Sequence, residues 1–184
     1  MKKAITLPLL IAVSCLIAGI YGVLHDQITY TISPEYYTKY KFIQFGLTEF
    51  GMPERTNRVM AAIVGWMATW WVGLILGIIL SLTGLIHKTW QQMFKVTLKA
   101  ILINLLVSFI FGILGYLYAL AFMPHEWQDY LSFWDVPYEI VDIKNYLRVG
   151  CIHTFGYLGG VIGLPIAIAY SIRTKRRIAR STII

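Results

Sequence analysis

The chain has 184 residues, enough for one domain, but its composition excludes an ordinary soluble one. Apolar residues make up 58% of it and charged residues only 14%, whereas soluble domains carry roughly 25% charged residues. The net charge of +7 does not indicate a nucleic-acid partner, because the basic residues flank apolar stretches. We therefore expect the lipid bilayer as the main partner of this chain, and no nucleic acid.

Four segments are apolar and long enough to cross a bilayer, whose core of about 30 Å needs about 20 helical residues. They cover approximately residues 5–24, 59–86, 98–123 and 149–172, and none contains an aspartate or a glutamate. Unpaired backbone groups are costly in lipid, so each segment must be helical. The predicted fold is all-α, a bundle of four transmembrane helices with two structured extracytoplasmic loops, residues 25–58 and 124–148.

The first apolar segment has a second interpretation, because it also resembles a signal sequence. Residues 11–15 loosely fit a lipoprotein cleavage box that would place the processed end at Cys15. The apolar run continues to Leu24, which favours an uncleaved helix. Cys15 and Cys151 both lie in apolar stretches, so they do not indicate a disulfide framework.

The first long loop, residues 25–58, is too rich in aromatic residues for a plain linker. Residues 28–32 alternate in the manner of a short strand. Ser33 and Pro34 then have the pattern of a helix cap and first turn. We expect an amphipathic helix that lies on the membrane surface or over the mouth of the bundle and ends near Gly46. Its expected apolar face is formed by Tyr36, Tyr40, Ile43 and Leu47, with Glu35, Lys39 and Lys41 pointing elsewhere.

The same loop carries a resemblance. Residues 25–47, HDQITYTISPEYYTKYKFIQFGL, are similar to a recurring signature of a group of small bacterial integral membrane proteins. The likeness extends in pattern to the spans, including residues 65–71, GWMATWW. It implies a location in the bacterial inner membrane, and it implies no activity and no catalytic residue.

Small residues recur at every fourth position in three of the spans. In the second span they are Ala61, Gly65, Thr69, Gly73, Gly77 and Ser81, and in the third Ala100, Asn104, Ser108 and Gly112. In the fourth they are Gly156 with Gly160, and Gly159 with Gly163, Ala167 and Ser171. Such rows let helix backbones approach closely in lipid. They predict tight packing within one bundle, with contacts between copies of a homo-oligomer as the alternative.

The second long loop, residues 124–148, is expected to contain the start of a new helix at Asp135 and Pro137 that runs without a break into the fourth span. At 100° per residue, Tyr146, Val149 and His153 share one stripe with Gly160. His153 is therefore expected to face the packing side of this helix and not the lipid.

The distribution of charge predicts the orientation of the bundle, because an excess of Lys and Arg marks the cytoplasmic side. The two termini and the short link after residue 86, together with Lys99, hold ten basic residues and no acidic ones, whereas the two long loops hold all nine acidic residues. Both termini are thus expected in the cytoplasm and both loops outside it. The basic tail, residues 173–180, is interpreted as a topology signal and an anchor for anionic lipids.

Three of the four histidines fall at the expected outer rim, namely His25, His125 and His153. Carboxylates follow two of them, in the pairs His25–Asp26 and His125–Glu126. Imidazoles and carboxylates are ligands for divalent metals such as zinc, so these residues are candidate metal ligands if the helix ends converge. The alternative is that they are interfacial or packing residues. His87, in the short link, is expected to be solvated.

Two residues are candidates for a catalytic role beside such a site. Glu126 is a candidate general acid or base, and Arg148 could hold a lipid phosphate or a substrate anion, or simply extend its charge to the interface.

Three functions remain open from the sequence. The first is a structural or accessory protein whose outer loops bind another membrane or periplasmic protein. The second is a membrane-surface enzyme with a His/carboxylate site, with or without a divalent metal, at the outer rim. The third is an oligomeric transporter or pore, although the expected midplane offers no ionisable side chain of the kind that coupled transporters use.

Overall fold

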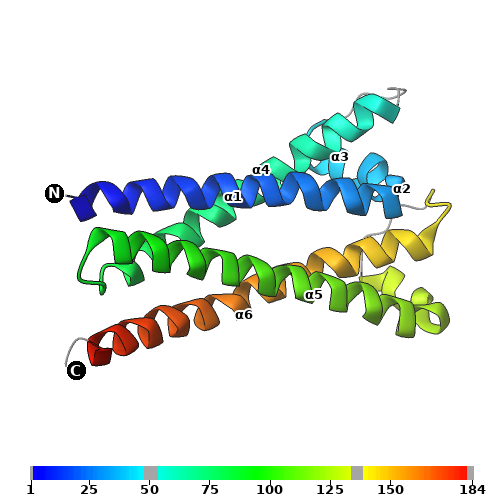
Figure 1. Ribbon diagram of the computed structural model, residues 1–184. Helices are drawn as coiled ribbons and strands as arrows, with labels where there is room; N and C mark the ends of the chain where they lie inside the picture. The colour runs from blue at the N-terminus through cyan, green and yellow to red at the C-terminus, as the bar shows by residue number, and fades with distance from the viewer. Residues whose placement is uncertain (1, 48–53, 134–138, 182–184) are drawn as a thin grey trace.

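The structure is a computed structural model that describes residues 2–47, 54–133 and 139–181, with side chains described outside residues 54–55 and 123–138. Its long helices are α1 (Lys2–Ile32), α4 (Glu54–Gly84), α5 (Trp90–Phe133) and α6 (Ile143–Ser181) (Figure 1). Between α1 and α4 lie α2 (Pro34–Tyr36), the π-helical turn η1 (Tyr37–Lys41) and α3 (Phe42–Gln44). The four long helices are each apolar enough to cross a membrane, which confirms the predicted fold class.

The long helices form two pairs that lie against each other. Helix α1 packs along α4 and α5 packs along α6, whereas contacts between the pairs are much sparser. The two chain ends lie at one end of the bundle, beside the turn from α4 to α5, and α2 lies at the other end (Figure 1). The loose fit between the pairs leaves room for a cavity between them.

The rows of small residues explain the close packing within each pair. A Cβ added to Gly65 of α4 would lie 2.3 Å from the carbonyl oxygen of Gly22 in α1. A Cβ added to Gly159 of α6 would lie 2.5 Å from the Cβ of Phe111 in α5. These rows therefore act as predicted, as surfaces that let backbones approach.

Gly156 and Gly160 do not follow this prediction. A Cβ added to either residue would meet nothing within 4 Å. Both residues instead line the cavity between the helix pairs. The spacing of four residues identified the row, but it could not tell a row that faces a helix from one that faces a cavity.

The strand expected at residues 28–32 is wrong, because α1 continues to Ile32. The hydroxyls of Thr29 and Thr31 donate to carbonyl oxygens four residues earlier, at His25 and Gln27, as helical threonines do. The expected start of the next helix is confirmed. Ser33 caps α2, and its side chain accepts from the backbone N–H of Tyr36.

The expected apolar face of this short helix is only partly correct. Tyr36 is buried, as expected, but Ile43 is 57% exposed and Lys41 is buried. The π-helical turn η1 adds a residue to one turn and so shifts the register of the face. At the C-terminus, Gly46 has a φ of +70° and Leu47 donates to the carbonyl of Phe42, which is a Schellman ending at the expected glycine.

The helix expected to begin at Asp135 and Pro137 and run unbroken into the fourth span is also wrong. These two residues lie outside the described part of the chain, but residues 139–142 are not helical and α6 begins at Ile143. Asp142 caps α6 by accepting from the backbone N–H of Asn145. The carboxylate of Glu35 accepts from the backbone N–H groups of Val141 and Asp142, so it ties α2 to the start of α6.

Candidate functional site

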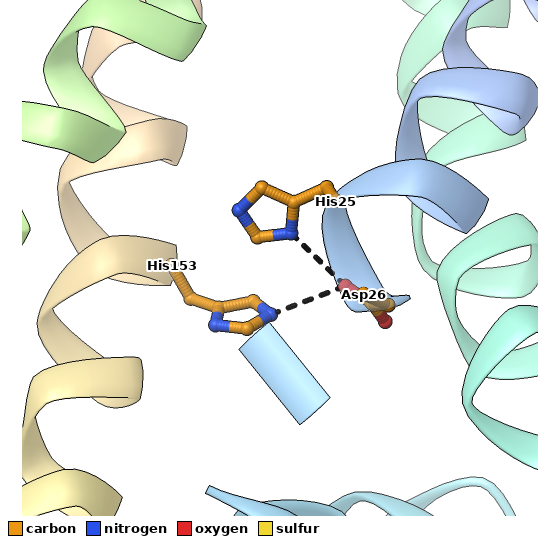
Figure 2. A group of neighbouring side chains, drawn as sticks. All are labelled: His25, Asp26 and His153. Carbon is orange, nitrogen blue, oxygen red and sulfur yellow. Dashed lines mark hydrogen bonds and ion pairs between the residues drawn. The ribbon is translucent and has the colours of Figure 1, made fainter. Parts of the chain in front are cut away.

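Three of the predicted metal ligands meet at the α2 end of the bundle. His25 and Asp26 project from α1, and His153 projects from α6, across the gap between the helix pairs (Figure 2). Nδ1 of His25 lies 3.0 Å from Oδ1 of Asp26, and Nε2 of His153 lies 3.4 Å from the same oxygen. Asp26 is 4% exposed, so its charge is met by these side chains and hardly by solvent.

The hydrogen bond of Nδ1 determines which ring nitrogen of His153 carries a proton. Nδ1 lies 2.9 Å from the carbonyl oxygen of Val149, one turn earlier in α6, and can only donate to it. A neutral ring then presents a lone pair at Nε2, facing a carboxylate oxygen that is also an acceptor. Two facing acceptors at this distance need either a proton, carried by the ring or by the carboxyl group, or a metal ion that binds both atoms.

Two distances within this cluster fit a small metal ion, 3.0 Å from His25 to Asp26 and 3.4 Å from His153 to Asp26. One donor atom from each of His25, Asp26 and His153 can be chosen so that all lie within 4.8 Å of one another. Two ligands that lie about 2.1 Å from one ion are at most about 4.2 Å apart, so donor atoms at the 4.8 Å limit would have to move closer on binding. In a tetrahedral zinc site with bonds of about 2.0–2.1 Å, neighbouring ligand atoms are about 3.3 Å apart. The bond from Nδ1 of His153 to a backbone carbonyl is also the usual way in which a metal-binding histidine is oriented.

Aromatic rings hold the two histidines in place. The ring of Tyr36 stacks on that of His153, with centroids 5.2 Å apart, and His25 meets His153 edge to face at 4.8 Å. On the adjoining turn of α1, Thr29 and the buried Tyr37 share a hydrogen bond of 2.5 Å. The π-helical segment therefore closes the site from the α2 end.

Lys41 is a charged residue of the site that the sequence pattern did not identify. Its side chain is 7% exposed, and its Nζ donates to Oε1 of Gln44 at 2.9 Å. The rings of Tyr36, Tyr40 and Phe45 lie 5.3 to 5.9 Å from this ammonium group. Burial lowers the pKa of Lys41, and the charge of Asp26 partly offsets this effect. The signal in the sequence was a lysine inside the aromatic run of residues 36–42.

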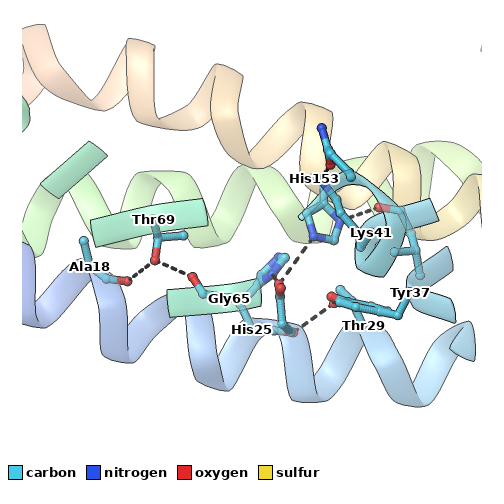
Figure 3. Close-up of polar contacts among 11 residues, drawn as sticks. Ala18, His25, Thr29, Tyr37, Lys41, Gly65, Thr69 and His153 are labelled. Atoms are coloured by element: carbon cyan, nitrogen blue, oxygen red, sulfur yellow. Dashed lines mark hydrogen bonds and ion pairs between the residues drawn. The ribbon is translucent and has the colours of Figure 1, made fainter. Parts of the chain in front are cut away.

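The polar cluster closes one end of a cavity of about 380 Å³ between the two helix pairs. His25, Asp26, Lys41 and His153 form its polar end, and most of its remaining wall is apolar. Figure 3 shows His25, Lys41 and His153 close together, and a separate group of contacts between Thr69, Ala18 and Gly65. Thr69 donates to the carbonyl oxygens of Ala18 and Gly65, so its hydroxyl proton serves helix packing.

Arg148 does not join this cluster. Arg148 donates from Nη1 to Oδ1 of Asn145 at 2.8 Å, within its own helix. The side chains of His125 and Glu126 lie outside the described part of the structure, so their predicted roles stay predictions.

The expectation that His87 is solvated is wrong. His87 is 2% exposed, and its Nε2 lies 3.1 Å from Oγ of Ser171 in α6. It lies at the end of the bundle opposite to Asp26, where Lys3 donates to its carbonyl oxygen. The short turn after α4 folds back against α6, which the length of the link did not reveal.

Comparison with known proteins does not assign this chain to a family. No protein-family model matches this chain. No curated protein and no solved structure is significantly similar to it either. The function is therefore inferred from the site alone.

Proposed function

We propose that the protein is a metal-dependent enzyme of the bacterial inner membrane, with His25, Asp26 and His153 as its metal ligands. The observation that carries the proposal is the contact of 3.4 Å between Nε2 of His153 and Oδ1 of Asp26, which are two acceptors when the ring is neutral and the carboxylate is ionised. A divalent transition metal satisfies both atoms and recruits the neighbouring His25.

Among the described side chains the cluster supplies three ligands, and this number favours a catalytic role over a structural one. Structural zinc sites are closed by four protein ligands, whereas catalytic sites have three and keep a position open for water or substrate. A divalent metal held by these residues would lower the pKa of a bound water to near 7 and so would supply a nucleophile for hydrolysis of an ester or amide. Asp26 and the two imidazoles hold the ion, and the stacked ring of Tyr36 keeps His153 aligned.

The proposed position of this centre is the extracytoplasmic boundary of the membrane. His25 lies about 33 Å along α1 from Lys3, and His153 about 30 Å along α6 from Arg173, at 1.5 Å per residue. Both distances match a hydrocarbon core of about 30 Å. With the basic chain ends in the cytoplasm, as the charge distribution favours, the cluster faces the opposite side.

A structural or accessory role has less support. It was motivated by the aromatic residues of the first long loop, which an outward-facing surface could offer to a partner. Tyr36, Tyr37 and Phe42 are instead buried against the bundle, where they pack around the polar cluster. A homo-oligomer or a pore has no particular observation in its favour.

The direct test is the metal content of the full chain purified in a nonionic detergent and loaded with zinc. We expect one zinc ion per chain, and its loss in the variants His153→Ala and Asp26→Asn. His87→Gln is the matched control, because it changes a buried histidine at the other end of the bundle. Wild-type protein that retains no zinc after dialysis, or equal retention in all variants, would refute the proposal.

A further inference from the structure

The cavity beside the cluster has the size of a ligand site. Its volume of about 380 Å³ lies within the range of roughly 300–1,000 Å³ that is usual for small-molecule pockets. Below the polar end its walls are made by apolar side chains from α4, α5 and α6, among them Val72, Leu105 and Leu164. A ligand that fills this space needs a polar head and an apolar body.

A second, larger groove of about 770 Å³ lies between α1 and α5 and reaches the same histidine. Tyr21, His25 and Leu105 line both spaces. The walls of the groove include Leu24 and Ile28 of α1, which are 60% and 58% exposed, and Leu106 of α5, which is 56% exposed. Since these helices are apolar enough to cross a membrane, this side of the groove faces lipid. The lipid-facing groove thus reaches His25, and the side chains of Tyr21, His25 and Leu105 lie between it and the cavity.

The charge of the polar end selects the head group. Lys41 is buried, and among the described residues no carboxylate lies within ion-pair distance of its ammonium group. With a divalent metal on Asp26 and two neutral imidazoles, the centre carries a net positive charge in addition to that of Lys41. Lysine and a divalent metal together are a common setting for phosphate groups.

From these observations we infer that the site takes a long-chain amphiphile with a phosphate head group, a lipid-type substrate. The phosphate lies at Lys41 and the His25–Asp26–His153 centre, and the chain lies in the cavity between the helix pairs. This inference rests on the proposed function, because the metal centre supplies part of the positive charge that binds the phosphate. The fit of the alkyl chain of the amphiphile depends on the cavity alone.

Two glycines allow the cavity to be filled without disturbing helix packing. Gly156 and Gly160 line it, and a Cβ on either residue meets nothing within 4 Å. The variant Gly160→Leu therefore places its side chain where the amphiphile chain would lie. Ala12→Leu is the matched control, because Ala12 is exposed on α1 and lines none of the cavities described here.

The experiment measures binding of dodecyl phosphate to the zinc-loaded full chain in dodecyl maltoside, by titration calorimetry, with dodecyltrimethylammonium as the probe of opposite charge. We expect binding of the phosphate and not of the ammonium compound. Lys41→Met should weaken binding about tenfold, since it removes a charge-assisted contact. Gly160→Leu should abolish it, and Ala12→Leu should leave it unchanged.

The zinc content of every sample separates the two proposals. Zinc-loaded wild-type protein that binds no dodecyl phosphate, or binds it equally well in the Gly160→Leu variant, overturns the inference and leaves the metal centre standing. Protein that holds no zinc but binds dodecyl phosphate in a manner sensitive to Gly160→Leu and Lys41→Met refutes the metal centre and retains the amphiphile site.

Discussion

His87 and His153 are both buried in the bundle, yet their surroundings give them different chemistry. His153 faces the carboxylate of Asp26, whereas Lys3 and Lys175 lie near His87 and Ser171 is its side-chain partner. Burial, together with these two lysines, lowers the pKa of His87. His87 is therefore a neutral packing residue at neutral pH, and His153 is the histidine with a partner suited to a cation.

The lowered pKa of His87 predicts how stability depends on pH. In the unfolded chain a histidine titrates at about pH 6.5. Just below that pH, His87 is protonated in the unfolded state but stays neutral in the folded state. The contribution of His87 to stability is thus complete above that pH and is lost as the pH falls toward its folded pKa. We expect the thermal unfolding midpoint of the wild type to fall more between about pH 7.5 and pH 5 than the midpoint of His87→Gln. These two pH values lie on either side of the titration of an unfolded histidine at about 6.5. Parallel profiles for the two proteins would contradict this assignment.

At this scale the sequence predicted part of the site. The sequence indicated His25, Asp26, His125 and His153 as candidate metal ligands if the helix ends converge. The structure brings His25, Asp26 and His153 together, and the side chain of His125 lies outside the described residues. Lys41 was expected to point away from the apolar face of its helix, because a regular helical period was assumed. The π-helical turn η1 moves Lys41 inward. Because such a turn depends on tertiary packing, no local sequence pattern predicts it.

At the scale of the elements, glycines on α4 and on α6 have opposite roles, and matched substitutions should separate them. Gly65→Ala should destabilise the protein by about 1–3 kcal/mol, because its Cβ would overlap the backbone of Gly22. Gly160→Ala should be neutral or stabilise by up to about 1 kcal/mol, because alanine favours the helix and the space is open. Chemical unfolding in mixed micelles gives both values. Equal destabilisation by the two changes would mean that Gly160 packs against a helix.

The link from α2 to α6 depends on one carboxylate. Glu35 accepts from Lys39 and from the backbone N–H groups of Val141 and Asp142. Slight burial raises the pKa of Glu35, but these hydrogen bonds outweigh it and lower the pKa overall. Its contribution to stability is therefore present above about pH 4.5 and is lost as the pH falls through the lowered value.

Replacing this carboxylate should loosen the start of α6. We expect Glu35→Gln to reduce stability by about 1 kcal/mol at pH 7, since a charge-assisted contact becomes a neutral one. The difference from the wild type should vanish in acid, where Glu35 itself is protonated. Amide hydrogen exchange at residues 141–146 measures the effect, and unchanged protection there would show that Glu35 does not hold this segment.

The element boundaries were harder to predict than the elements. Hydropathy located all four long helices, because lipid imposes a minimum apolar length on each. It could not place their ends, since α1 and α5 continue well beyond the predicted residues 5–24 and 98–123. Polar residues such as those after Leu24 can continue a helix, because their backbone hydrogen bonds are made within it. Hydropathy alone does not distinguish such residues from a loop.

At the scale of the whole molecule, the helices are longer than a membrane is thick. Helix α5 has 44 residues and α6 has 39, which correspond to about 66 Å and 58 Å, against a hydrocarbon core of about 30 Å. Both helices must therefore extend beyond the hydrocarbon or cross it at a tilt. The two chain ends and the turn from α4 to α5 lie at one end of the bundle, and α2 lies at the other (Figure 1). Ten of the sixteen basic residues belong to the segments at the first end, whereas His153 of the polar cluster stacks on Tyr36 of α2.

The proposed orientation predicts where the C-terminus lies. A fluorescent protein fused after Ile184 should fluoresce in a bacterial cell, and alkaline phosphatase fused at the same point should be inactive, because this enzyme needs the oxidising periplasm. Active phosphatase at this position would reverse the bundle and place the His–Asp–His cluster at the cytoplasmic boundary.

The central claim is that His25, Asp26 and His153 share one metal ion. X-ray absorption at the zinc edge of the zinc-loaded full chain tests it most directly, because it reports the ligand atoms themselves. The account predicts a first shell of nitrogen and oxygen at about 2.0–2.1 Å with the outer-shell scattering of two imidazoles. A shell with sulfur, or with oxygen alone and no imidazole signal, would contradict it.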